Sequence, residues 1–426
     1  MPPNNKEILI ITTMKKSTSL VYIHFLYRSL LKINTNFLVL KKRSIGFLMV
    51  LMLILASNTA FAQLAVPFSP RLPGGNIKIK GDIVLIGNSI ITGEGLSLPY
   101  NGNGNNNNLN GAYINVASGG DPNIFSSSTA DLEINNSCKN IVFAGLYWAS
   151  VYPNEVGTNS GQQFQGTPRI EDWNQIKFKL PTGGFIDLEA DNNADPVGDE
   201  DDIIFDGYDA VNINNSFKDS PIICYKNVTS LLQGLTEADG TYTVANQRAT
   251  RGSRTGGCAA GWTLVVIYES PLLPSKFISV FDGYAGVQGT TILNIPVSGY
   301  QTLPAPFPVN AKIGVSALEG DLGIRGDSFR FRATTSPGVN YTALSDVVNP
   351  ANNFFNSNIT INGVDNTSRN PASINTLGFD INNVIVPNPS NQVIPNNSSS
   401  GELRLTTRGD GYGAFVTSFA VDIIEP

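Results

Sequence analysis

Short apolar stretches separated by turn-forming clusters dominate the sequence after residue 62. Residues 175–180 alternate apolar and polar side chains with a period of two, the pattern of a strand with one dry and one wet face. Continuous apolar runs at 141–148, 262–268 and 277–281 indicate buried strands. We therefore expect an all-β protein, an antiparallel β-sandwich or jelly roll, because such folds combine many short strands with long end loops.

One short helix interrupts this pattern. At 227–235, Asn227 is placed to cap a helix whose apolar residues Val228, Leu231 and Leu232 recur at helical spacing. Gly234 should end it after about two turns.

A proline-rich stretch divides the mature chain. Pro304, Pro306 and Pro308 stand at every second position, where they cannot donate ladder hydrogen bonds, so this segment is a linker or an edge. The sequence thus predicts two packed sandwich units. Residues 63–300 would form the first, with an Asn-rich loop at 101–110 and an acidic loop, and residues 301–426 the second.

The N-terminal segment has the features of an export signal. Basic residues at 41–43 precede an apolar run at 45–56, and Ala60 and Ala62 match an A-x-A cleavage pattern. The run is short for a membrane anchor, the alternative interpretation. Residues 1–40 are unusual for a signal peptide. A start codon that was assigned too early explains them, and Met14 is one alternative start. We therefore interpret 1–62 as a signal peptide with a mis-started leader.

Charge and composition then exclude several functions. Removal of 1–62 takes away eight of the 28 basic and one of the 34 acidic residues and leaves a net charge of −13. Such a surface repels nucleic acid and anionic lipid. The only histidine, His24, is also removed, which excludes Ser-His-Asp and Cys-His catalysis and every His-ligated metal site.

Three cysteines remain: Cys138, Cys224 and Cys258. Export permits disulfides, and Cys224 and Cys258 flank the strand expected at 241–245, so we predict that they pair. Buried free thiols are the alternative.

The most acidic stretch, 191–209, suggests a calcium site, because Ca²⁺ takes six to eight oxygen ligands. Its spacing does not match an EF-hand loop, since Pro196 occupies the required glycine position. A solvated acidic loop is the alternative. The expected ligands are Asp195, Asp199, Asp201 and Asp202.

Other carboxylates and aromatic residues carry weaker signals. The tripeptide Arg-Gly-Asp, known from integrin recognition, occurs at 325–327 and 408–410. We interpret each copy as a Gly-Asp turn between strands rather than as an integrin-binding site. Carboxylates that could support glycoside hydrolysis have no selective spacing; they are Glu269, Asp282, Glu319, Asp321 and Asp327. Aromatic residues that could stack on sugars lie mostly in apolar strands, so we expect core packing; they are Tyr147, Trp148, Trp173, Trp262 and Tyr284.

Several longer motifs resemble the N-terminal module of large Bacteroidetes cell-surface proteins of the gliding-motility-associated and adhesin-like kind. They are FAGLYW at 143–148, GTYTVAN at 240–246, GWTLVVIYE at 261–269, VFDGY at 280–284, EGDLGIRGDS at 319–328, NTLGFD at 375–380 and RLTTRGDGY at 404–412. The resemblance implies an exported all-β module with no catalytic residues to carry over. Relatives continue into immunoglobulin-like repeats and a sorting domain for type IX secretion. This chain ends at Pro426 without them, which suggests either a truncated reading frame or a module that works alone.

The sequence thus predicts a non-enzymatic binding or adhesion module, located at the cell surface or outside the cell, with the periplasm as fallback. It would not be an integral membrane protein after signal cleavage. A surface glycan or another envelope protein would be its partner. The alternatives are a carbohydrate-active enzyme that uses paired carboxylates and a structural spacer of an envelope assembly.

Overall fold

The computed structural model describes residues 63–117, 121–134, 136, 138–158, 165–191, 201–208, 219–335 and 340–424. They belong to one compact unit, Ala60–Pro426. Among these residues no helix is long and apolar enough to cross a membrane. The predicted signal and leader lie outside the described residues.

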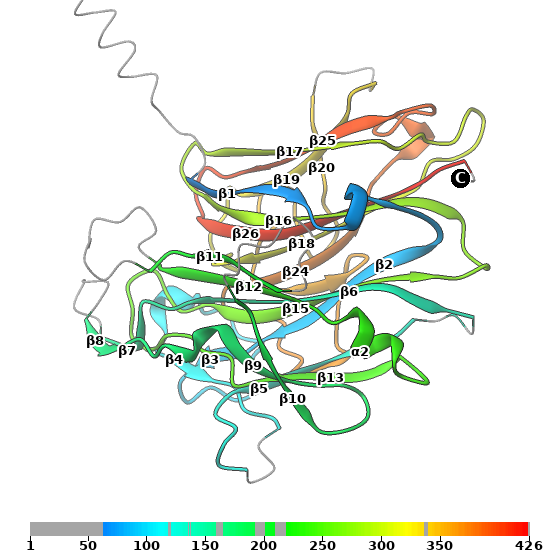
Figure 1. Cartoon of the computed structure of the whole chain (residues 1–426). Coiled ribbons are helices and arrows are strands. Elements are labelled where there is room, and N and C mark those ends of the chain that lie inside the picture. The colour runs from blue at the N-terminus through cyan, green and yellow to red at the C-terminus, as the bar shows by residue number, and fades with distance from the viewer. Residues whose placement is uncertain are drawn as a thin grey trace, which may run out of the picture. The chain divides into compact units, whose positions relative to one another are not determined.

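Four layers of antiparallel sheet form this unit (Figure 1). The two inner layers are the halves of one sheet, which has 12 strands within the described residues. Its first half contains, in spatial order, β11 (Asp201–Asp206), β12 (Pro221–Asn227), β6 (Asn140–Val151), β15 (Ala260–Glu269) and β2 (Ile77–Ser89). Its second half continues with β16 (Ser275–Val287), β26 (Tyr412–Asp422), β18 (Ala311–Leu318), β24 (Phe379–Ile385), β21 (Ile359–Ile361) and β22 (Val364–Asp365), while β1 (Gln63–Pro70) also pairs with β16.

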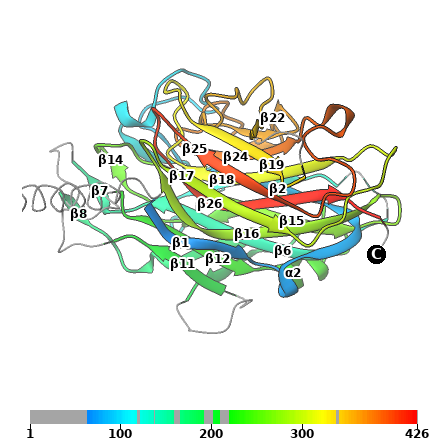
Figure 2. The same ribbon diagram turned by 90° about the horizontal axis from the view of Figure 1, so that it is seen from above.

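The outer layers are two smaller sheets. One contains β10 (Phe185–Glu189), β9 (Gln175–Lys179), β13 (Gly240–Ala245), β5 (Ser127–Leu132) and β23 (Arg369–Asn370). The other contains β17 (Ile292–Ser298), β25 (Ser400–Thr406), β19 (Ser328–Ala333) and β20 (Thr342–Ala343), and it lies over β16, β26 and β18 (Figure 2). A small sheet at one end joins β3 (Ile91–Gly93), β4 (Gly111–Tyr113), β14 (Arg251–Gly252), β7 (Asn154–Gly157) and β8 (Gly166–Pro168).

Strand β2 connects the two inner layers. Residues 77–80 pair with β16, whereas residues 81–89 pair with β15. The two halves of the sheet pack face to face across a cluster that includes Leu85, Tyr147, Val265, Val280 and Ile381. Two further clusters fill the spaces between each inner layer and its outer sheet. The prediction of an all-β fold with packed sandwiches is therefore confirmed.

The predicted boundary between 63–300 and 301–426 does not divide the sandwiches. Strands β1, β16 and β17 come from the first range but pair within the second sandwich, and β23 from the second range pairs with β5 in the first. The proline-rich segment is only the connection between β17 and β18. The prolines correctly indicated a loop at this position. The layers, however, are determined by hydrogen bonding between strands that lie far apart in the sequence.

The predicted helix is present as α2 (Thr229–Gln233) and ends at Gly234. The Asn227 side chain accepts a hydrogen bond from the Thr229 amide at 3.0 Å. Short 3-10 turns occur at Pro73–Gly75, Asn106–Asn108, Asp172–Asn174 and Pro389–Asn391.

Candidate functional site: a polar groove beside the outer sheet

A groove of about 340 Å³ opens beside the outer sheet of the first sandwich. Strands β9 and β10 form one wall. Phe125, just before β5, and Asn246, just after β13, also line the groove, and the 3-10 turn before β9 contributes Asp172. The side chains of β9 and β10 alternate, so their polar members face outward. The polar lining consists of Asp172, Gln175, Lys177, Asp187, Glu189 and Asn246.

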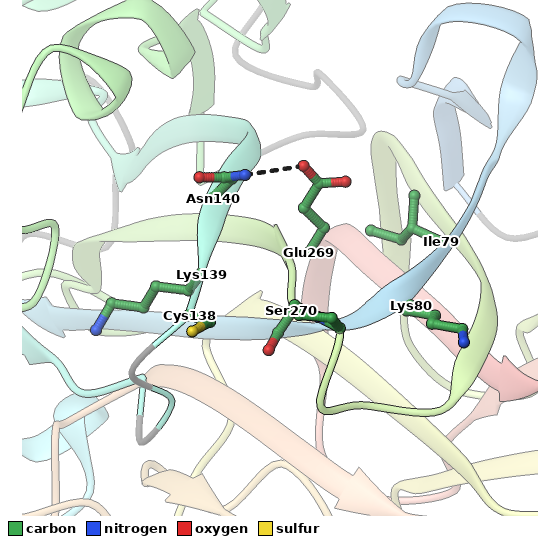
Figure 3. Close-up of a pocket in the computed structure, with 8 residues that line it drawn as sticks. Ile79, Lys80, Cys138, Lys139, Asn140, Glu269 and Ser270 are labelled. Atoms are coloured by element: carbon green, nitrogen blue, oxygen red, sulfur yellow. Dashed lines mark hydrogen bonds between the residues drawn. The ribbon is translucent and has the colours of Figure 1, made fainter.

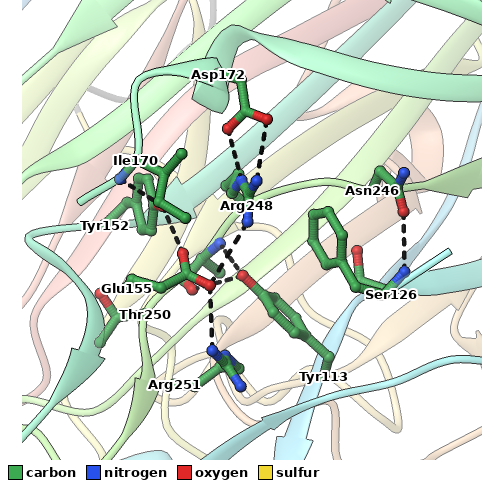
Figure 4. Close-up of polar contacts among 12 residues, drawn as sticks. Tyr113, Ser126, Tyr152, Glu155, Ile170, Asp172, Asn246, Arg248, Thr250 and Arg251 are labelled. Atoms are coloured by element: carbon green, nitrogen blue, oxygen red, sulfur yellow. Dashed lines mark hydrogen bonds and ion pairs between the residues drawn. The ribbon is translucent and has the colours of Figure 1, made fainter. Parts of the chain in front are cut away.

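A network of charged groups supports this groove from behind (Figure 4). Arg248 forms a bidentate pair with Asp172, with Nε to Oδ1 at 2.7 Å and Nη2 to Oδ2 at 3.0 Å. The same guanidinium stacks over the Phe125 ring at 4.5 Å. Its Nη1 also lies 3.6 Å from Oε1 of Glu155.

Glu155 is the centre of the network and is only 7% exposed. It accepts hydrogen bonds from the Tyr152 hydroxyl at 2.6 Å and from Arg251 at 3.2 Å. Burial, followed by the hydrogen bond to Glu155, raises the pKa of Tyr152 far above its usual value. Hydrogen bonding by Arg248 lowers the pKa of Asp172 below its usual value. Arg248 therefore stays paired with an ionised Asp172.

The open part of the groove offers hydrogen-bonding groups of both kinds. Lys177 and Asp187 form an exposed ion pair at 2.6 Å, and Asn174 donates to Glu189 at 3.2 Å. Asn246, at a φ of +59°, is used for structure because its Oδ1 accepts from the Phe125 amide at 3.0 Å. Lysine, carboxylate and amide groups beside an aromatic ring suit a ligand with many hydroxyl groups.

Sequence reasoning missed this groove. Its members come from segments up to 121 residues apart, Arg248 lies in no recognised motif, and the motif that ends at Asn246 carried no binding role. The one available signal was the run of Arg248, Arg251 and Arg254, which is unusual in a chain with few basic residues.

Of the five carboxylates considered for hydrolysis, Glu269 and Asp282 lie apart from the other three. Glu269 lies at the end of β15 in a second cleft of about 520 Å³, where Asn140 donates to it at 3.1 Å (Figure 3). Asp282 is buried on β16, where it pairs with Arg71 at 2.5 Å and accepts from Tyr147 at 2.9 Å. Glu319, Asp321 and Asp327 lie near each other after β18, in neither of these two cavities.

Two of the four predicted calcium ligands, Asp195 and Asp199, lie outside the described residues. Asp201 begins β11, and its side chain is also not described. The Asp202 carboxylate pairs with Arg71 at 2.5 Å. The calcium site at this segment stays a prediction.

The predicted disulfide between Cys224 and Cys258 is not formed in the structure, where both are free, buried thiols. Cys224 faces the core of the first sandwich from β12, whereas Cys258 packs near Gly111 in the end sheet. Burial raises the pKa of both thiols, that of Cys258 to about 12. Cys138 is free and exposed.

The aromatic residues proposed for sugar stacking are core residues, as predicted. All five are at most 9% exposed: Tyr147, Trp148, Trp173, Trp262 and Tyr284. In the Asn-rich loop 101–110, Asn106 packs inward, is 3% exposed and donates to Glu319 at 2.9 Å, whereas Asn101, Asn103, Asn107 and Asn108 are exposed.

Comparison with known proteins gives no family. No protein-family model and no curated protein matches the chain. A solved structure of the triple jelly roll fold and turret assembly in an archaeal virus is similar at a TM-score of 0.15 and 7% identity; the match covers 85% of this chain and 61% of that one. Recombinant peptide:N-glycanase F is similar at a TM-score of 0.17 and 10% identity, with 80% and 96% covered. Scores this low carry no argument about function.

Proposed function

We propose that this chain is an exported, non-enzymatic binding module that acts at the cell surface or outside the cell and recognises a surface glycan through the groove at β9 and β10. One observation carries the proposal: polar side chains of a rigid outer sheet line a groove that is supported by the ion pairs of Arg248 with Asp172 and Glu155. Recognition groups on a rigid β scaffold are typical of binding modules.

The groove favours binding over catalysis. Asp172, its carboxylate nearest to Arg248, is kept ionised by a bidentate pair. Hydrolysis of a glycosidic bond needs one carboxylic acid that holds a proton beside one that does not.

A glycan array probed with the purified protein tests the proposal, with Lys177→Ala and Glu189→Gln as groove variants. Lys179→Ala, also on β9, is the matched control because Lys179 does not line the groove. We expect binding to a defined glycan class that falls at least tenfold in the groove variants and stays within twofold in the control. Equal binding by all variants would place recognition elsewhere.

Product release from a polysaccharide panel would instead identify an enzyme, particularly if Glu269→Gln or Glu319→Gln abolished it. If the array is silent, capture of one envelope protein by the wild type but not by Lys177→Ala would identify a protein partner for the same groove.

A further inference from the structure

The two Arg-Gly-Asp tripeptides pack against each other. The amide of Arg408 donates to the carbonyl oxygen of Gly326 at 3.1 Å, and a Cβ on Gly326 would stand 2.7 Å from the amide nitrogen of Gly409. Both arginines are exposed, whereas Asp327 is 0% and Asp410 4% exposed. The aspartates therefore face the interior, where an integrin could not reach them.

Two further buried carboxylates join them. Asp321 is 1% and Asp380 0% exposed, and the Asp321 amide donates to Asp410 at 2.7 Å. Asp380 and Asp410 each interact electrostatically with Asp327. Among the described residues none of the four forms an ion pair with an arginine or a lysine. Burying several carboxylates without a counter-charge is costly.

The segment 353–358 contacts two of these carboxylates and carries neutral oxygens that lack hydrogen-bond donors. This segment donates the Phe355 amide to Asp327 at 2.6 Å and the Asn358 amide to Asp380 at 3.1 Å. The amide oxygens of Asn353, Asn356 and Asn358, each at most 7% exposed, have no hydrogen-bond donor. One oxygen of each of three carboxylates also has none: Asp321, Asp327 and Asp380.

Gly320 packs directly against two oxygens of this region. A Cβ on Gly320 would stand 2.3 Å from Oδ2 of Asp380 and 2.7 Å from the carbonyl oxygen of Phe355. The Asp380 oxygen that lacks a donor and the Phe355 carbonyl oxygen therefore lie on the same side of Gly320, where any side chain would clash with them. All the unsatisfied groups named here are acceptors, so the region lacks either donors or a cation.

We propose that Asp327 and Asp380, together with neutral oxygens of segment 353–358, bind a calcium ion. Carboxylate, amide and carbonyl oxygens are the ligands that this hard cation prefers, six to eight in number. Among the described residues no three Asp, Glu, His or Cys side chains form a metal-binding group by themselves, so neutral oxygens must supply most of the shell. This site is distinct from the acidic stretch 191–209.

Calcium titration of the metal-stripped protein, followed by calorimetry and thermal unfolding, tests the proposal. We expect one ion per chain at this site and a rise in melting temperature. In Asp327→Asn and Asp380→Asn, affinity should fall at least tenfold. Asn has the shape of a protonated Asp, so cooperative unfolding of both variants should persist and show that they fold. Asp131→Asn, a half-buried aspartate on β5 of the other sandwich, is the matched control.

Two results would overturn the proposal. One is an unchanged wild-type melting temperature at calcium concentrations well above the roughly 10⁻⁴–10⁻³ M range of extracellular sites. The other is calcium binding that Asp195→Asn with Asp199→Asn abolishes and that Asp327→Asn and Asp380→Asn leave intact. Binding that survives in the first pair and is lost in the second would support it.

Discussion

Gly409 lies against the carbonyl oxygen of Arg325, and a Cβ built on Gly409 would stand 2.1 Å from that oxygen. This contact allows the two Arg-Gly-Asp turns to pack together. We expect Gly409→Ala to force them apart and lower the free energy of unfolding by roughly 2–4 kcal/mol. Urea unfolding measures this. Gly184→Ala, which meets nothing within 4 Å, should change stability by less than about 0.5 kcal/mol; equal effects would refute the explanation.

The buried pair between Arg71 and Asp282 should also be essential for stability. Arg71 lies between Asp282 and Asp202 and stacks over Tyr225 at 4.3 Å. Arg71→Met leaves Asp282 buried and unpaired, so we expect a loss of about 3–5 kcal/mol. Adding Asp282→Asn should recover part of it. Lys177→Ala, which breaks an exposed pair, should cost at most about 1 kcal/mol.

The edge of β2 depends on one amide side chain. The Leu85 amide donates to Oδ1 of Asn383 at 3.0 Å, and Nδ2 of Asn383 donates back to the Leu85 carbonyl at 2.9 Å. Asn383→Leu leaves both backbone groups buried without these partners, so we expect a loss of roughly 2–3 kcal/mol in chemical unfolding. Asn110→Ala, whose bond to Glu94 is exposed, serves as the control and should be nearly neutral.

Thiol labelling distinguishes free cysteines from a disulfide. A pKa of about 12 leaves roughly one Cys258 thiolate in 10⁴ at pH 8, and Cys224 is fully buried with a pKa raised by desolvation. We expect mass spectrometry to find Cys138 alone labelled in the native protein. In denaturant without reductant all three should react. If only Cys138 reacts until reductant is added, Cys224 and Cys258 are paired.

Local patterns in the sequence were sufficient to predict several strands and the helix. Alternation at 175–180 predicted β9, the apolar runs predicted β6, β15 and β16, and Asn227 and Gly234 marked the ends of α2. These features depend on neighbours within a few residues. The division at the prolines failed because it required knowing that β16 pairs with β26, more than 120 residues later.

The carboxylate cluster and the groove could not be predicted from the sequence for the same reason. Asp321 and Asp327 could be selected from the sequence as buried-turn carboxylates, but Asp380 and Asp410 reach them only through pairing of β18 with β24 and β26. The groove likewise joins Phe125, Asp172 and Asn246. No spacing rule connects such residues before the sheets are known.

The position of β16 between the first and last strands affects how this protein can be made. β1 and the start of β2 lie along one edge of β16 and β26 lies along the other. A nascent chain therefore carries β1 and the start of β2 without these partners until residues 275–287 emerge, and the middle of the sheet closes only once residues 412–422 have followed. Such distant pairings make folding slow. Folding of the central sheet therefore waits for residues 412–422, and a chain cut before them would leave β16 and β18 without the strand that lies between them.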